Sequence, residues 1–134
     1  MTTGILVHLP VKTRNPMNGQ TGNSKLAAII RSQQRAKLRG ITKLVVLAAL
    51  KSHQMIGPEL APWRVRMTRV SAGRLDPHDG LGASLKGCID GVAEALGIDD
   101  GDAARIRFVL EQRKGPKGHY EVEILLEPQA WRTT

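Results

Sequence analysis

Four aspartates lie in two pairs at the ends of one predicted helix, over residues 80–96. Asp76 and Asp79 occupy the corner that leads into this helix, and Asp99 and Asp100 follow directly after it. Carboxylates are the ligands that a hard cation such as Mg²⁺ prefers, and such an ion keeps water positions open for a phosphodiester and its nucleophile. The pattern therefore indicates a candidate centre for metal-assisted hydrolysis. The alternative is a structural role, because aspartates also cap helices and fill turns.

The chain offers few ligands for other metals. His78 stands between the first two aspartates, but a single histidine in a turn is more often solvated, and a magnesium site prefers oxygen. The other histidines share no metal-ligand spacing with Cys88, which argues against a zinc site. Cys88 falls on the apolar stripe of the predicted helix and is expected in the core. As the only cysteine, it fits a reducing compartment such as the cytoplasm.

Positive charge is concentrated in the first part of the chain. Residues 1–74 carry 13 lysines and arginines and one acid, a net charge of +12, whereas residues 75–134 carry 7 basic residues and 11 acids, a net charge of −4. A basic surface of this kind can hold DNA by its phosphates without reading bases. The residues expected to do so are Arg14, Lys25, Arg31, Arg35, Lys37, Arg39 and Lys43. The alternative is a solvated helix face.

The elements that must position these residues follow from the apolar pattern. Strands are expected over residues 5–9, 63–68, 106–110 and 120–124, and helices from residue 25 to about 53 and from 80 to 96. We expect the first strand, apolar on both faces, to be central, Gly40 to interrupt the long helix, and Gly97 to end the second helix. The last two strands are expected to form a hairpin through a turn at 114–118.

This order predicts an α/β (α+β) fold in which two main helices pack on one small mixed sheet of about four strands. The length of 134 residues predicts a single domain over residues 1–134. The apolar runs fall well short of the ~20 residues that span a bilayer, so no membrane segment is expected, and the N-terminus does not resemble a signal peptide.

Three stretches are similar to the signature of RusA-type Holliday-junction resolvases: residues 75–81, 85–86 and 90–100. In that family an acidic D-x-D-N motif opens a helix that ends near an I-D-D or V-D-D motif. The order of elements also looks like that of phage and prophage members, so the resemblance covers most of the chain. It implies a RusA-like fold and an endonuclease that uses Mg²⁺, or Mn²⁺ in its place, to resolve branched double-stranded DNA in recombination and repair.

The resemblance carries over to individual positions. By register, Asp79 matches the family's second metal-binding aspartate, and Asp100 matches the aspartate after the helix. Pro77 stands where the family has its first aspartate, and the adjacent Asp76 is its expected substitute. Gly80 stands where the family has the motif asparagine. Because neither proline nor glycine brings a metal ligand, these departures leave open a relative that binds DNA without cutting it.

A lysine lies on the same general side of the predicted helix. The family lysine falls at Ala83 by register, and the nearby Lys86 is a candidate for orienting phosphate. The resemblance therefore implies the catalytic residues Asp76, Asp79, Lys86 and Asp100, and the metal ligands Asp76, Asp79, Asp99 and Asp100.

The length of the helix bears on assembly. A helix over residues 80–96 is ~25 Å long, so Asp79 and Asp100 cannot share a metal ion if the chain simply continues past its end. Either the following turn folds back, or a second subunit completes the site. An antiparallel two-fold pairing would give two active sites, which suits a junction that needs two symmetric cuts. The resemblance likewise implies a homodimer.

Three functions of different classes remain open. The first is a structure-selective endonuclease in the cytoplasm of a bacterium or a phage-infected host. The second is a catalytically inactive DNA-binding or DNA-packaging protein of the same fold. The third is a basic RNA-binding protein of ribosomal type, which explains the charge but leaves the paired acidic turns unexplained. The aromatic content of 3% argues against a stacking platform for single strands.

Overall fold

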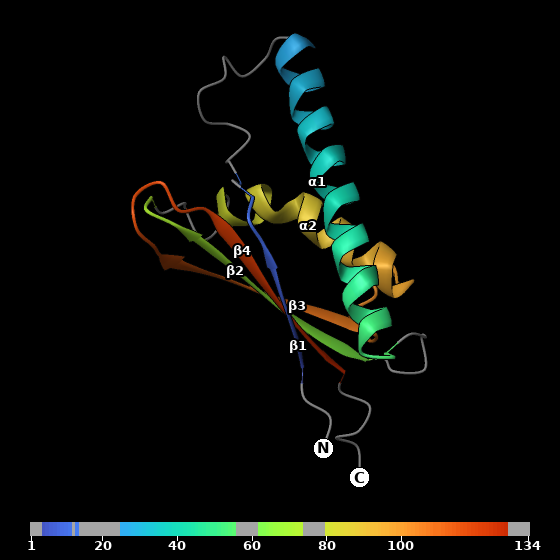
Figure 1. Cartoon of the computed structure of the whole chain (residues 1–134). Coiled ribbons are helices and arrows are strands. Elements are labelled where there is room, and N and C mark those ends of the chain that lie inside the picture. Colours follow the sequence, from blue (N-terminus) through green and yellow to red (C-terminus); the bar gives the residue numbers. More distant parts are fainter. Residues whose placement is uncertain (1–3, 12, 14–24, 56–61, 74–79, 129–134) are drawn as a thin grey trace.

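The computed structural model of the chain describes residues 4–11, 13, 25–55, 62–73 and 80–128 (Figure 1). Six elements follow one another: β1 (Ile5–Leu9), α1 (Lys25–Ser52), β2 (Trp63–Ser71), α2 (Gly80–Leu96), β3 (Ile106–Lys114) and β4 (Glu121–Pro128). The four strands form one mixed sheet with both helices packed on it, which confirms the predicted fold class. Among the described residues, no helix is long and apolar enough to cross a membrane.

The strand order in the sheet is β1-β4-β2-β3, which shows that two predictions are wrong. β1 is an edge strand and not a central one, and its Leu6 side chain is 54% exposed. β3 forms no hairpin with β4: it pairs with β2 in parallel, and β4 lies antiparallel between β1 and β2. The reason is the crossover through α2. A helix between two strands brings the second back parallel to the first, so β3 takes one edge of β2 and leaves the other for β4.

The core lies between the helices and one face of the sheet. Trp63, Val65 and Met67 alternate on β2 with half-buried residues, and the same alternation along β4 buries Ile124. α2 contributes its apolar stripe, which includes Cys88. Burial raises the pKa of the Cys88 thiol to about 11, so it stays protonated and packs as an apolar side chain, as predicted.

α1 and α2 cross at close range because α2 carries two glycines one turn apart (Figure 1). A Cβ placed on Gly91 would lie 2.6 Å from the carbonyl oxygen of Arg39 and 2.7 Å from the Cβ of Thr42. A Cβ on Gly87 would lie 3.0 Å from the carbonyl oxygen of Arg35. The two helix backbones therefore pack directly against each other. This contact places the charged side chains of α1 beside those of α2.

Gly40 was predicted to interrupt α1 and Gly97 to end α2, and only the second prediction is confirmed. α1 runs unbroken through Gly40, so the interruption predicted there is wrong: one glycine costs a helix only about 1 kcal/mol, which its neighbours offset. Gly97 ends α2 as predicted, with a φ of +70°. The N–H groups of Gly97 and Ile98 donate to the carbonyl oxygens of Glu94 and Ala93. These bonds form a Schellman motif, which turns the chain after α2.

Candidate functional site

Lys86 joins two carboxylates at the surface of α2. Its Nζ lies 2.6 Å from Oδ2 of Asp100 and 3.1 Å from Oδ1 of Asp90. The helix places Asp90 one turn after Lys86 on the same face, and the turn at Gly97 brings Asp100 back to them. The hydrogen bond to Asp100 raises the pKa of Lys86, and the same bond lowers the pKa of Asp100. Both groups are therefore charged at neutral pH.

Asp90 is the less exposed of these two aspartates, and it links Lys86 and Asp100 to α1. Its side chain is 15% exposed, against 33% for Asp100. Its Oδ2 accepts hydrogen bonds from Nε and Nη2 of Arg35, at 3.1 and 2.9 Å. Arg35, Asp90, Lys86 and Asp100 thus form a chain of alternating charge, here called the Lys86 cluster. Asp90 is not among the predicted site residues, although its four-residue spacing from Lys86 on a helix is a signal that could have found it.

Among the described residues, none of the other predicted aspartates pairs with Lys86. Asp99 is exposed, and its Oδ1 accepts the backbone N–H of Gly101 at 3.0 Å, so it shapes the turn. Asp76 and Asp79 lie outside the described residues. In the sequence, Asp79 directly precedes Gly80, the first residue of α2.

A groove of about 1030 Å³ lies between residues 31–41 of α1 and residues 83–87 of α2. Five basic side chains line it: Arg31, Arg35, Lys37, Arg39 and Lys86. Lys25 and Lys43 do not line the groove, and Arg14 lies outside the described residues. Four of the seven residues predicted to bind nucleic acid therefore share one concave surface with Lys86, and this surface suits an anionic ligand.

Acids of α2 compensate part of the positive charge of α1. Glu94 pairs with Arg39 at 3.2 Å and with Lys43 at 3.9 Å, while Asp90 pairs with Arg35. The three basic side chains remain about half exposed, and exposed pairs of this kind contribute at most about 1 kcal/mol each. A phosphate group can therefore compete for them. Part of the charge imbalance between the two parts of the sequence is therefore balanced by pairing between the two helices.

Protein families and curated proteins were compared with the chain by sequence. No protein-family model matches the chain, and no curated protein matches it. A function for this chain therefore has to follow from its own residues, foremost the Lys86 cluster and the basic groove beside it.

Proposed function

We propose that this protein is a structure-selective endonuclease that cleaves Holliday junctions or other branched DNA by Mg²⁺-dependent hydrolysis. The observation that carries the proposal is the Lys86 cluster, two carboxylates around one ammonium group, next to a groove lined by arginine and lysine. It falls within the stretch that resembles RusA-type resolvases. We place this activity in DNA recombination and repair, in the cytoplasm of a bacterium or a phage-infected host.

The carboxylates of the Lys86 cluster are oxygen ligands of the kind that a magnesium ion prefers. Asp100 is ionised and partly exposed, so a divalent ion could bind its carboxylate in place of Lys86, whose positive charge competes with the ion. Asp79 and Asp76, from the segment before α2, would hold the ion together with Asp100. The bound ion would polarise the scissile phosphate and lower the pKa of a bound water.

Lys86 has two roles in this proposal. Without a cation, its ammonium group balances Asp90 and Asp100. Once a cation neutralises Asp100, Lys86 can turn to a phosphate oxygen of DNA in the groove that it lines. The bonds from Arg35 to Asp90 link α1 to α2 beside this groove.

We also propose a homodimer, because a four-way junction needs two symmetric cuts. The position of Asp100 also bears on whether Asp79 and Asp100 of one chain can belong to the same active site. Asp100 bonds to Lys86, which lies only six residues, or about 9 Å of helix rise, from the start of α2. The turn after α2 therefore folds back, which favours an active site built within one chain.

A cleavage assay on a synthetic four-way junction tests the proposed activity. With Mg²⁺, the wild-type protein is expected to cut two opposing strands symmetrically. Linear duplex of the same sequence and a reaction with chelator are the controls, and both should stay uncut.

A protein that binds junctions but never cuts them with Mg²⁺ or Mn²⁺ would refute the nuclease. The second candidate, an inactive DNA-binding protein of the same fold, would then take its place. Two departures from the resolvase motif favour that candidate: Pro77 in place of an acidic ligand and Gly80 in place of the asparagine.

The groove predicts which lysine contacts DNA. Lys37 is exposed and lines the groove, whereas Lys51 is an exposed lysine in the last turn of the same helix and does not line it. Lys37→Ala is expected to weaken binding to any DNA and to lower the slope of log affinity against log salt by about one. Lys51→Ala should bind like wild type. Equal slopes for both variants across a salt series would place DNA on a different surface.

A further inference from the structure

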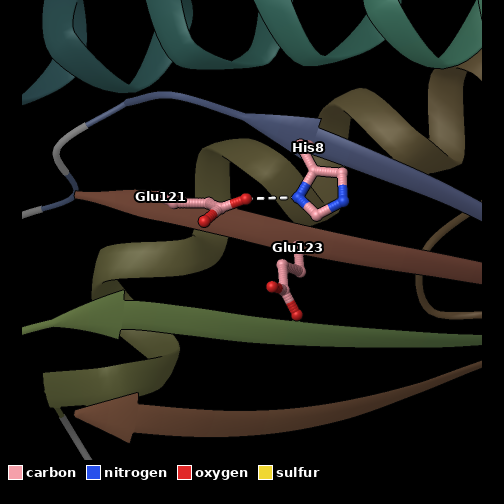
Figure 2. A group of neighbouring side chains, drawn as sticks. All are labelled: His8, Glu121 and Glu123. Atoms are coloured by element: carbon pink, nitrogen blue, oxygen red, sulfur yellow. Dashed lines mark hydrogen bonds and ion pairs between the residues drawn. The ribbon is translucent and has the colours of Figure 1, made fainter. Parts of the chain in front are cut away.

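Three side chains that can bind a metal gather on the open face of the sheet, which α1 and α2 leave uncovered (Figure 2). His8 lies on β1, and Glu121 and Glu123 lie on β4. The register places His8 opposite Glu123, and the two glutamates point to the same side because they are two residues apart on a strand. One ligand atom from each residue lies within 4.8 Å of the others.

A second imidazole reaches the same carboxylate. Nδ1 of His8 shares a hydrogen bond with Oε2 of Glu121, and Nε2 of His119 lies 3.1 Å from Oε1 of the same residue. Both histidine side chains are 53% exposed, whereas those of Glu121 and Glu123 are 17% and 19% exposed. The carboxylates thus form the floor of the cluster and the imidazoles its rim, so an ion can reach it from solvent.

We propose that His8, Glu121 and Glu123, here called the sheet cluster, bind one divalent transition-metal ion, with Zn²⁺ as the best match. Imidazole nitrogen suits Zn²⁺ and its neighbours, whereas Mg²⁺ prefers oxygen ligands alone. These three side chains supply three ligands of a tetrahedral zinc site, and the fourth position is left to water or to His119, whose Nε2 lies 3.1 Å from Oε1 of Glu121. The sheet cluster lies on the other face of the sheet from the two helices, so this proposal does not depend on the nuclease.

Such an ion would stabilise the pairing of β1 with β4 at the edge of the sheet. β1 is a short edge strand, and the ion would add ligand bonds from His8 to two residues of β4. An ion that binds only the folded chain stabilises it by mass action. Zinc should therefore raise the unfolding temperature.

The positive charge of Arg113 lies beside Glu123 and should weaken metal binding, so replacing Arg113 tests the proposed ligands. Its Nη1 and Nη2 donate to the two carboxylate oxygens of Glu123, at 3.1 and 2.6 Å. Because a carboxylate has about four lone-pair sites, Glu123 can accept both bonds and still bind a metal. The positive charge of Arg113 nevertheless disfavours a cation beside it. Removing that charge should tighten zinc binding.

Calorimetric titration of the metal-free protein with ZnCl₂ tests the sheet cluster. Wild type should bind one ion per chain, and so should His53→Ala, which removes a histidine that bonds to its own helix at Ala49. His8→Ala and the isosteric Glu121→Gln should each weaken binding at least about tenfold. Arg113→Gln should strengthen it.

Thermal unfolding with and without ZnCl₂ gives an independent readout. Zinc should stabilise wild type and Asp100→Asn alike, because Asp100 belongs to the Lys86 cluster. Absence of zinc binding by wild type would overturn the sheet cluster, as would unchanged affinity in both His8→Ala and Glu121→Gln. Loss of binding in Asp100→Asn alone would place the ion at the Lys86 cluster and would also overturn it.

Discussion

Replacing Asp100 with asparagine is expected to abolish Mg²⁺-dependent cleavage of a four-way junction while leaving junction binding in place. Asparagine keeps the size and one oxygen of the side chain but loses the charge that holds a divalent cation. A bound metal contributes several kcal/mol to such a reaction, so a loss on the order of 100-fold or more is expected. Single-turnover cleavage rates, measured beside equilibrium binding, separate the two effects.

The same substitution should tighten binding in the absence of metal. Lys86 then keeps only Asp90 as a carboxylate partner, and its charge becomes available to DNA in the groove. Asp102→Asn is the matched control, because it removes the same charge from the same turn outside the Lys86 cluster. Asp102→Asn should cleave like wild type. If Asp100→Asn cuts as fast as wild type, the role given to Asp100 is wrong.

Gly91→Ala is expected to destabilise the fold by about 1–3 kcal/mol, although alanine is the better helix former. The new methyl group would lie 2.6 Å from a carbonyl oxygen of α1 and 3.0 Å from the backbone nitrogen of Lys43. Backbone atoms cannot rotate away as a flexible side chain can, so the helices have to separate. Chemical denaturation at equilibrium measures the change in free energy of unfolding.

Gly82→Ala provides the comparison for that measurement. Gly82 lies in the same helix, and a Cβ there would meet nothing within 4 Å. Alanine at this position should stabilise the protein by up to about 1 kcal/mol. Opposite signs for the two substitutions are the expected result. Equal stabilisation by both would contradict the close contact between α1 and α2.

The elements of the fold could be predicted from the sequence because their signals are local. Apolar periodicity indicates each helix and strand within a few residues of chain. The strand order could not be predicted in the same way, since pairing joins distant segments. The apolar Leu6 suggested a central strand buried on both faces, but Leu6 is 54% exposed and β1 is an edge strand. The turn at 114–118 resembles that of a hairpin, although the strands beside it belong to opposite sides of β2.

In the candidate site, too, single residues could be predicted from local signals, whereas their contacts could not. Asp100 and Lys86 could be selected as individual residues, the first by its place after the helix and the second by its place on it. Their contact depends on the turn at Gly97, and the bond between Arg35 and Asp90 joins residues 55 positions apart. The residues of the sheet cluster form no sequence motif, because His8 and Glu121 are 113 positions apart. A search for regular ligand spacing therefore misses it.

The central place of β4 has a consequence for folding during synthesis. β4 is made after every other described element, yet it lies between β1 and β2 and pairs with both. Until β4 leaves the ribosome, β1 has no neighbour in the described sheet, and one edge of β2 stays open. Open strand edges favour aggregation, and non-local pairing slows folding. The nascent chain therefore has to keep its first strand unpaired, or protected by a chaperone, until nearly all of the described sequence has been translated.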